Sequence, residues 1–267
     1  MESYDFIIVC AGSAGSALAS RLSEDPAKRI LLLEAGGADS HPWVRIPMGY
    51  GKVFYDQRVN WKYTTEPNET LDGNKIYWPR GKVMGGSSSI NAMVYVRGHP
   101  QDYDRWALDA PGWSWTDVAP IFKRMETWVG TPNPDRGTAG PLSVRCTADD
   151  VHPLCAHYLQ AAEQAGFDFN PDYNSGQMEG AALYQITAKD GLRASASRAY
   201  ITPVKHRLNL TLELRAHVQK LCFEGRRVTG VSYRQKGQLK TAYARGEVIL
   251  CGGAINSPQL LQLSGIG

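Results

Sequence analysis

The N-terminal segment carries the feature that most restricts the fold. Residues 4–9 (YDFIIV) are a short apolar run typical of a buried parallel strand, and the small residues Cys10-Ala-Gly12-Ser-Ala-Gly15 follow it directly. A helical pattern comes next, and then a second apolar run at 30–33. Strand, glycine turn, helix and strand in this order predict a βαβ unit with a ligand-binding loop at its first turn.

The ends of this unit indicate which ligand the loop binds. The N-terminus of the helix offers free amides and the positive end of the helix dipole, which suit a pyrophosphate. Glu34 ends the second strand, about 20 residues beyond Gly12, where an acid can accept hydrogen bonds from an adenosine ribose. The segment therefore predicts a dinucleotide site.

One position departs from the glycine fingerprint of such sites. The fingerprint has glycine first, for the tight turn, and this chain has Cys10, whereas Gly12 and Gly15 keep the second and third positions. We expect the Cβ of Cys10 to strain the turn or crowd the ligand, and so to weaken cofactor binding without abolishing it.

A second segment, residues 79–102 (PRGKVMGGSSSINAMVYVRGHPQD), is dense in groups that bind anions. Its glycines let the backbone approach a ligand, its serines and Asn91 add side-chain donors, and Arg80 adds a positive fork suited to phosphate. A flexible linker has a similar composition, but this segment runs straight into an apolar strand at 93–96. We interpret it as a cofactor cradle.

Composition excludes several other classes of protein. A net charge of +3 without any basic run argues against nucleic acid, and no apolar run is long enough to span a bilayer. The five cysteines lack CxxC spacing and the six histidines are scattered, so we expect neither a disulfide framework nor a metal site. With an acidic N-terminus in place of a signal peptide, the chain is predicted to be cytoplasmic.

The remaining pattern places the other elements. Residues 41–78 predict a long ordered excursion rich in aromatic residues, and 115–128 and 151–165 predict helices, the second with Leu154 and Tyr158 on its apolar side. Short strands at 210–214, 218–223, 228–234 and 239–244 predict a β-meander, followed by a separate strand at 247–251. Ser257 and Pro258 predict the start of a last helix. The predicted fold class is α/β (α+β overall), with a Rossmann-like domain, a mixed sheet and a meander.

Three motifs together resemble the glucose-methanol-choline (GMC) family of FAD-dependent oxidoreductases, most closely its choline dehydrogenase-like and alcohol oxidase branch. They are the N-terminal unit, the run from Arg80 to Asn91, which resembles the first family signature, and Gly253 to Gly267, which resembles the second. The resemblance implies FAD as cofactor. The residues that it places at FAD are Gly12, Ser13, Gly15, Glu34, Ala35, Arg80, Gly81, Val83, Gly86, Ser87, Asn91, Ala92, Met93, Val94 and Val218. Some relatives attach the flavin through a histidine where this chain has Ile90, so we expect non-covalent FAD.

The resemblance also implies a domain plan and a reaction. Residues 1–147 and 208–267 would form an incomplete, discontinuous FAD-binding domain, and 148–207 the start of a substrate-binding domain. Because the second signature falls near the middle of family members, we expect a C-terminal half beyond Gly267, either as continuation or as a second chain. That half would hold the catalytic histidine and its His/Asn partner, so no catalytic residue is assigned here.

The implied activity is oxidation of a small primary alcohol to an aldehyde, by hydride transfer to flavin N5, with oxygen or another acceptor reoxidising the flavin. Two alternatives stay open. One is a non-redox member resembling hydroxynitrile lyases, in which flavin is structural. The other is a flavin-binding half without activity of its own, which the cysteine at position 10 mildly favours.

Overall fold

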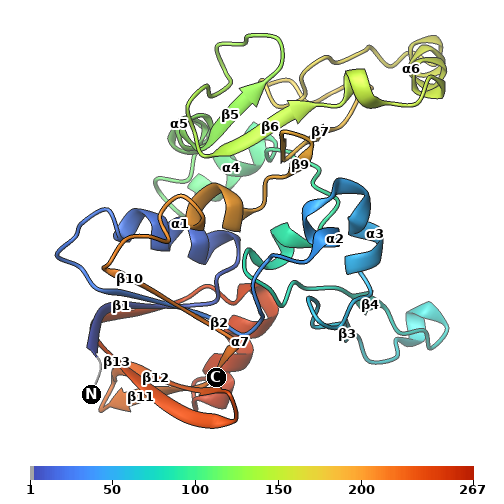
Figure 1. Ribbon diagram of the computed structural model, residues 1–267. Helices are drawn as coiled ribbons and strands as arrows, with labels where there is room; N and C mark the ends of the chain where they lie inside the picture. The colour runs from blue at the N-terminus through green and yellow to red at the C-terminus, as the bar shows by residue number, and fades with distance from the viewer. Residues whose placement is uncertain (1–2) are drawn as a thin grey trace. The chain divides into compact units, whose positions relative to one another are not determined.

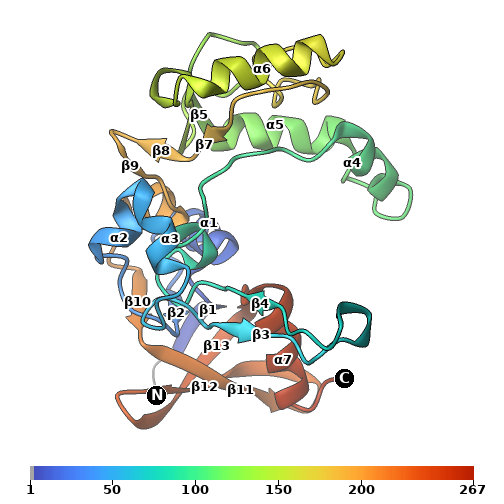
Figure 2. The same cartoon turned by 90° about the vertical axis from the view of Figure 1, so that its right-hand side faces the viewer.

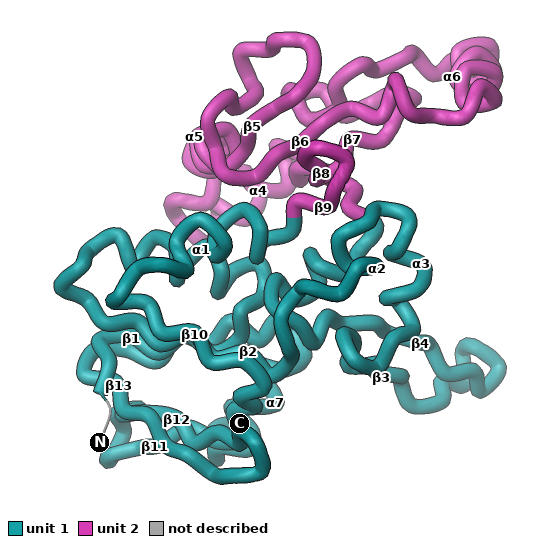
Figure 3. The backbone as a smooth tube through the Cα atoms, in the orientation of Figure 1, with its two compact units in different colours: residues 1–92, 195–267 teal, residues 93–194 magenta. Residues whose placement is uncertain are grey.

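The computed structural model describes residues 3–267, which divide into two compact units. Unit 1 contains residues up to Ala92 and from Ser195 onward, and unit 2 contains Met93–Ala194 (Figure 3). The chain therefore leaves unit 1 once and returns to it once. The predicted boundaries at 147 and 207 concern cofactor and substrate roles and stay predictions, because these units are defined by backbone contacts alone.

Unit 1 is built on one mixed sheet of six strands, in the order β10-β2-β1-β13-β12-β11 (Figure 1). The strands are β1 (Ser3–Val9), β2 (Ile30–Glu34), β10 (Leu210–Leu214), β11 (Ala216–Glu224), β12 (Arg227–Gln235) and β13 (Gln238–Leu250). Strands β10, β2, β1 and β13 are parallel to one another, whereas β12 pairs antiparallel with both β13 and β11. The predicted fold class, with its mixed sheet, is confirmed.

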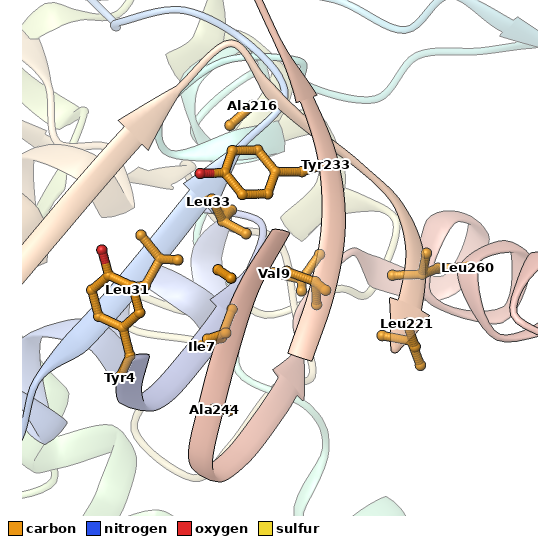
Figure 4. Close-up of a cluster of buried hydrophobic side chains, with 12 residues drawn as sticks. Tyr4, Ile7, Val9, Leu31, Leu33, Ala216, Leu221, Tyr233, Ala244 and Leu260 are labelled. Atoms are coloured by element: carbon orange, nitrogen blue, oxygen red, sulfur yellow. The ribbon is translucent and has the colours of Figure 1, made fainter. Parts of the chain in front are cut away.

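Both faces of the parallel part are buried, which explains its unbroken apolar sequence. Ile7 and Val9 point into one core with the apolar side chains of the meander, and Figure 4 shows Tyr233 and Ala216 lying over Leu33 there. Ile8 points to the opposite face and packs in a second core, which includes Ala19 of α1 (Ser13–Leu22). The period of two along β1 therefore fixes which face α1 covers.

Two details of the predicted meander are wrong. Residues 239–244 and 247–251 are not separate strands, because β13 continues through both and pairs first with β12 and then with β1. Residues 210–214 are a strand, but it lies beside β2 at the far edge of the sheet. The meander consists of β11, β12 and β13. Strand-to-strand pairing of this kind is a tertiary choice that local composition does not encode.

The excursion at 41–78 is ordered, as predicted, and belongs to unit 1. It contains short elements only. They are the helices α2 (Pro42–Arg45) and α3 (Tyr50–Val53), the 3₁₀ turns Pro47–Gly49 and Glu69–Leu71, and the strand pair β3 (Tyr63–Thr64) and β4 (Tyr77–Trp78). In Figure 2 the β3–β4 pair lies over α7 (Gly253–Leu263). The predicted start of α7 at Ser257 is wrong, because the helix begins a full turn earlier, with Gly252 as N-cap, and carries Pro258 in its interior.

Unit 2 contains three α-helices and two small sheets. The helices are α4 (Pro100–Ala107), α5 (Trp115–Met125) and α6 (Leu154–Gln164). The strands are β5 (Glu126–Val129), β6 (Leu142–Cys146) and β7 (Gln185–Ile186) in one sheet, and β8 (Ala188–Lys189) and β9 (Leu192–Arg193) in the other. Both predicted helices exist, although α5 ends at Met125 and its last predicted residues form β5.

The predicted apolar side of α6 is not covered. Leu154 is 66% exposed and Tyr158 is 76% exposed, and no residue of this helix is buried. Among residues 3–267, no helix is both long and apolar enough to cross a lipid bilayer.

Candidate nucleotide-binding site

The turn between β1 and α1 is as tight as a glycine fingerprint requires. A Cβ on Gly15 would lie 2.0 Å from the carbonyl oxygen of Cys10, so only glycine fits there. Cys10 itself has a φ of 84°, in the left-handed region that favours glycine. The structure thus places the predicted strain at position 10, where an L-residue adopts a backbone conformation that costs about 1–3 kcal/mol.

Glu34 is held at the end of β2 by this same turn. Its side chain is 2% exposed, and its Oε2 accepts the Ala11 amide at 2.9 Å and the Cys10 thiol at 3.5 Å. Its Oε1 accepts the Gly36 amide at 2.8 Å. Burial raises the pKa of the Glu34 carboxyl, and the three donors oppose that rise.

The second predicted segment packs directly against the first turn. The Gly85 amide donates to the Ala11 carbonyl at 2.7 Å, and a Cβ on Gly86 would lie 2.7 Å from the Cα of Gly12. A Cβ on Gly81 would in turn lie 2.2 Å from the carbonyl carbon of Gly86. These backbone contacts bring the two motifs together, although some 70 residues separate them in the sequence.

Two adjoining cavities open at this junction, and six residues line both. One cavity, of about 240 Å³, is also lined by Glu34, Ala35 and Val218. The other, of about 510 Å³, is also lined by Gly12, Ser13, Arg80, Gly81, Gly86 and Ser87. The residues common to both are Cys10, Trp61, Leu250, Gly252, Asn256 and Ser257. Nine of the predicted cofactor residues therefore line one continuous space at the carboxyl ends of β1, β2 and β13, where ligands bind in such sheets.

The other predicted residues lie outside the walls of these cavities. Gly15 packs against the carbonyl group of Cys10, within the turn itself. Val83 is buried in an apolar cluster with Ile90. Asn91 and Ala92 are exposed at the end of the first part of unit 1, and Met93 and Val94 belong to unit 2. Met93 has a φ of 65°, a second strained position in this run.

The prediction missed most of an aromatic wall on the same cavities. Trp61 lines both cavities, and its ring lies 5.3 Å from that of His217 and 5.8 Å, nearly parallel, from that of Tyr63. The Tyr63 hydroxyl donates to Asn256 of α7 at 2.9 Å, and the Lys82 ammonium lies 4.5 Å from the Trp61 ring centre. Trp61 was only one of many aromatic residues in its segment, and no local signal singles it out.

The chemistry of this donor set fits a dinucleotide. The larger cavity has backbone amides at the start of α1 and the Arg80 guanidinium for phosphate, and the smaller one has a carboxylate beside apolar side chains for a nucleoside. The glycines form a cradle that any Cβ would fill. Among the described residues 3–267, no group of three His, Cys, Asp or Glu side chains could hold a metal ion.

Unit 2 has a larger cavity, of about 1010 Å³, which contains none of the predicted site residues. It is lined by residues of β5, β6 and β8 and by loops that include residues 130–133 and 190–191. Beside it, Glu126 is fully buried and accepts hydrogen bonds from Arg97 and Arg136, both at 2.7 Å. Arg136 also pairs with Asp172, so two carboxylates balance the two guanidinium groups. We therefore interpret this network as a structural core and the nucleotide-binding cavities of unit 1 as the functional site.

Comparisons with known proteins agree with this geometry. A family model described as GMC oxidoreductase matches residues 4–267. The mitochondrial choline dehydrogenase of Mus musculus is 46% identical over 274 residues, which cover 100% of this chain and 46% of that protein. The alcohol dehydrogenase (acceptor) of Pseudomonas putida is 46% identical over 270 residues, covering 99% of this chain and 48% of that protein.

Solved structures give the same result. Pyridoxine 4-oxidase from Mesorbium loti superposes with a TM-score of 0.94 at 35% identity, over 99% of this chain and 52% of that one. A formate oxidase structure superposes with a TM-score of 0.90 at 27% identity, over 99% of this chain and 48% of that one. The chain thus spans about half the length of the curated relatives it matches.

Proposed function

Because this chain belongs to the GMC oxidoreductase family, we propose that it forms the FAD-binding part of an enzyme that oxidises a primary alcohol to an aldehyde. The observation that carries the proposal is the convergence of the N-terminal turn, Glu34 and the Arg80–Ser87 segment on two adjoining cavities. When bound, FAD supplies the hydride acceptor for such an oxidation. The alcohol class is carried over from relatives named for choline and alcohol.

In this proposal each part of the chain has a binding role. The amides at Gly12 and Ser13 and the Arg80 guanidinium hold the pyrophosphate, because they line the larger cavity. Glu34 accepts from the adenosine ribose, and the backbone at Val218 lies at the adenine end, because both line the smaller cavity. The closely packed glycines bring these groups near the ligand without side chains in between.

We further propose that FAD is bound without a covalent link. Ile90 stands where some relatives carry the attaching histidine, and its side chain is apolar and 2% exposed. It packs with Val44, Val53, Val59 and Val83. An alkyl side chain has no nucleophile to offer, so acid denaturation followed by ultrafiltration should release all of the flavin into the filtrate.

The remaining proposals concern the whole protein. We propose that a C-terminal half, equivalent to the second half of the relatives and present either as a continuation of this chain or as a second chain, supplies the catalytic base and most of the substrate pocket, since residues 1–267 match about half of each relative. From its composition, we propose that the protein is cytoplasmic. One relative, from mouse, is named as mitochondrial, so cell fractionation is the direct test of this proposal.

Anaerobic reduction tests the function directly. The protein, complete with the polypeptide that supplies its second half, is loaded with FAD and mixed without oxygen with choline, pyridoxine or a simple primary alcohol. Loss of the flavin absorbance near 450 nm, with one aldehyde formed per flavin, is the expected result for at least one of them. A flavin-loaded protein that no alcohol bleaches would contradict the proposed reaction, and cleavage of a cyanohydrin by that protein would favour a lyase. If the protein did not take up FAD, the result would favour the other alternative, a flavin-binding half without activity of its own.

A further inference from the structure

Cys10 occupies the junction between the two cavities of the nucleotide-binding site. It lines both of them, and its backbone is fixed because its carbonyl oxygen lies directly beneath Gly15. Its φ of 84° suits glycine, yet the chain places a side chain there. That side chain therefore projects from a rigid turn into the space where the two halves of a dinucleotide meet.

The thiol of Cys10 uses part of the acceptor capacity of Glu34. An ionised carboxylate has about four lone-pair positions, two on each oxygen. On Oε2 one is taken by the Ala11 amide and one by the Cys10 thiol, and on Oε1 one is taken by the Gly36 amide. A single position is left, on Oε1.

The thiol is suited to remain a donor in this contact. Burial and the neighbouring Glu34 carboxylate raise the pKa of Cys10 far above its ordinary value, so the sulfur keeps its proton at neutral pH. A glycine at this position would leave a second lone pair of Glu34 free, one on each oxygen. Two adjacent ribose hydroxyls could then each bind their own carboxylate oxygen.

We propose that Cys10 is a specificity-determining residue of the nucleotide-binding site, because its thiol limits Glu34 to binding one hydroxyl of the adenosine ribose instead of two. This inference rests on the proposed function, in that the ligand is a dinucleotide with an adenosine ribose. The chain accordingly discriminates weakly against nucleotides that lack one of the two hydroxyls. It holds the ribose by the Oε1 atom of Glu34, beside the Gly36 amide.

The ribose hydroxyls provide a direct test. Binding of ADP, 2′-deoxy-ADP and 3′-deoxy-ADP to the flavin-free protein is measured by calorimetry for the native chain and for Cys10→Ala, which keeps the Cβ and the backbone but removes the donor. In the native protein one deoxy analogue should bind within about twofold of ADP. In Cys10→Ala both analogues should bind about tenfold more weakly than ADP, since each then loses a hydrogen bond to a charged group.

Two further variants separate the thiol from other effects. Cys10→Ser keeps a donor at the same place and should show the native pattern, whereas Cys222→Ala removes a thiol of β11 that lines neither cavity and should leave the native pattern unchanged. If native protein, Cys10→Ala and Cys10→Ser all discriminated equally between ADP and its deoxy analogues, the inference would be overturned. The proposed function would still stand if these proteins bound FAD. A native protein that bound neither ADP nor FAD would overturn both.

Discussion

At the scale of single residues, backbone contacts in the nucleotide-binding site leave no room for a Cβ at three glycines. Gly15, Gly81 and Gly86 each face main-chain atoms, so a rotamer change in a neighbour could not make room for a Cβ. Glu34 is equally constrained, because two main-chain amides bind it from the turns on either side. This carboxylate therefore organises the protein before any ligand binds, and its ionisation should be visible in the stability of the fold.

The pH dependence of unfolding should reveal Glu34. Burial raises its pKa in the folded state above the unfolded value of about 4.3, so the folded protein binds this proton more tightly. The stability that this proton provides is fully present below pH 4.3 and is lost as the pH rises to the folded-state pKa. The free energy of unfolding of native protein minus that of Glu34→Gln should therefore decrease through this window and then level off.

Urea unfolding of the two proteins between pH 4 and pH 8 measures that difference, and the other titrating groups cancel because both proteins contain them. A difference that increased with pH would mean that the amides of Ala11 and Gly36 outweigh burial, and that the folded-state pKa of Glu34 is lowered.

At the scale of elements, the excursion at 41–78 is tied to the sheet and to α7 by side chains. Trp61 contacts His217 of β11, and Tyr63 donates to Asn256 of α7. Burial and the Lys82 ammonium lower the pKa of His217, which favours the neutral ring beside Trp61 at pH 7. Because Trp61 and Asn256 line both cavities, these contacts close the nucleotide-binding site from the side of the excursion.

Tyr63→Phe should loosen this closure without removing its aromatic stack. The variant loses the hydrogen bond to Asn256, which is 2.9 Å long, and keeps the ring beside Trp61. We expect a loss of about 1 kcal/mol, and flavin release about fivefold faster than from native protein. Recovery of free-flavin fluorescence after dilution measures the rate. Tyr158→Phe on the exposed helix α6 is the matched control, and an equal release rate for native protein and Tyr63→Phe would mean that the bond does not hold the site closed.

The same elements show how far the sequence predicts this fold. Helix α1 and strands β1 and β2 could be predicted because their apolar periodicity and glycine spacing are local. The continuity of β13 could not, since Gly246 interrupts an apolar pattern that tertiary pairing with β1 and β12 then overrides. The start of α7 was missed because Pro258 usually marks a first turn, and here it lies inside the helix.

At the scale of the whole molecule, the two units are stabilised in different ways. The apolar clusters on the two faces of the large sheet lie in unit 1, whereas unit 2 buries a charge network around Glu126. The same scale limits what a sequence reveals about the site. Trp61, His217 and Asn256 come from distant parts of the sequence, so no local motif predicts that they line one site. The glycine spacing of the two motifs, by contrast, is local and predicts the cradle.

Unit 2 also exposes apolar side chains that a folded protein normally covers. Leu154 and Tyr158 lie on the uncovered side of α6, and Phe167 and Tyr184 are likewise exposed. If the proposed C-terminal half covers α6, residues 1–267 alone should bind a hydrophobic dye such as ANS and self-associate, because large exposed apolar surface favours both. Producing residues 1–267 together with that half as a separate chain should suppress dye binding and give a one-to-one complex in size-exclusion chromatography with light scattering.

Charge substitutions locate the covered surface. Leu154→Lys combined with Tyr158→Lys should weaken the complex at least tenfold, because assembly would bury two unpaired ammonium groups. Leu208→Lys, a change at a fully exposed leucine of unit 1, is the control and should leave the complex intact. Both variants change only exposed positions and so should not disturb folding of the chain itself. If residues 1–267 alone were monomeric, bound no dye and oxidised alcohols, no C-terminal half would be needed.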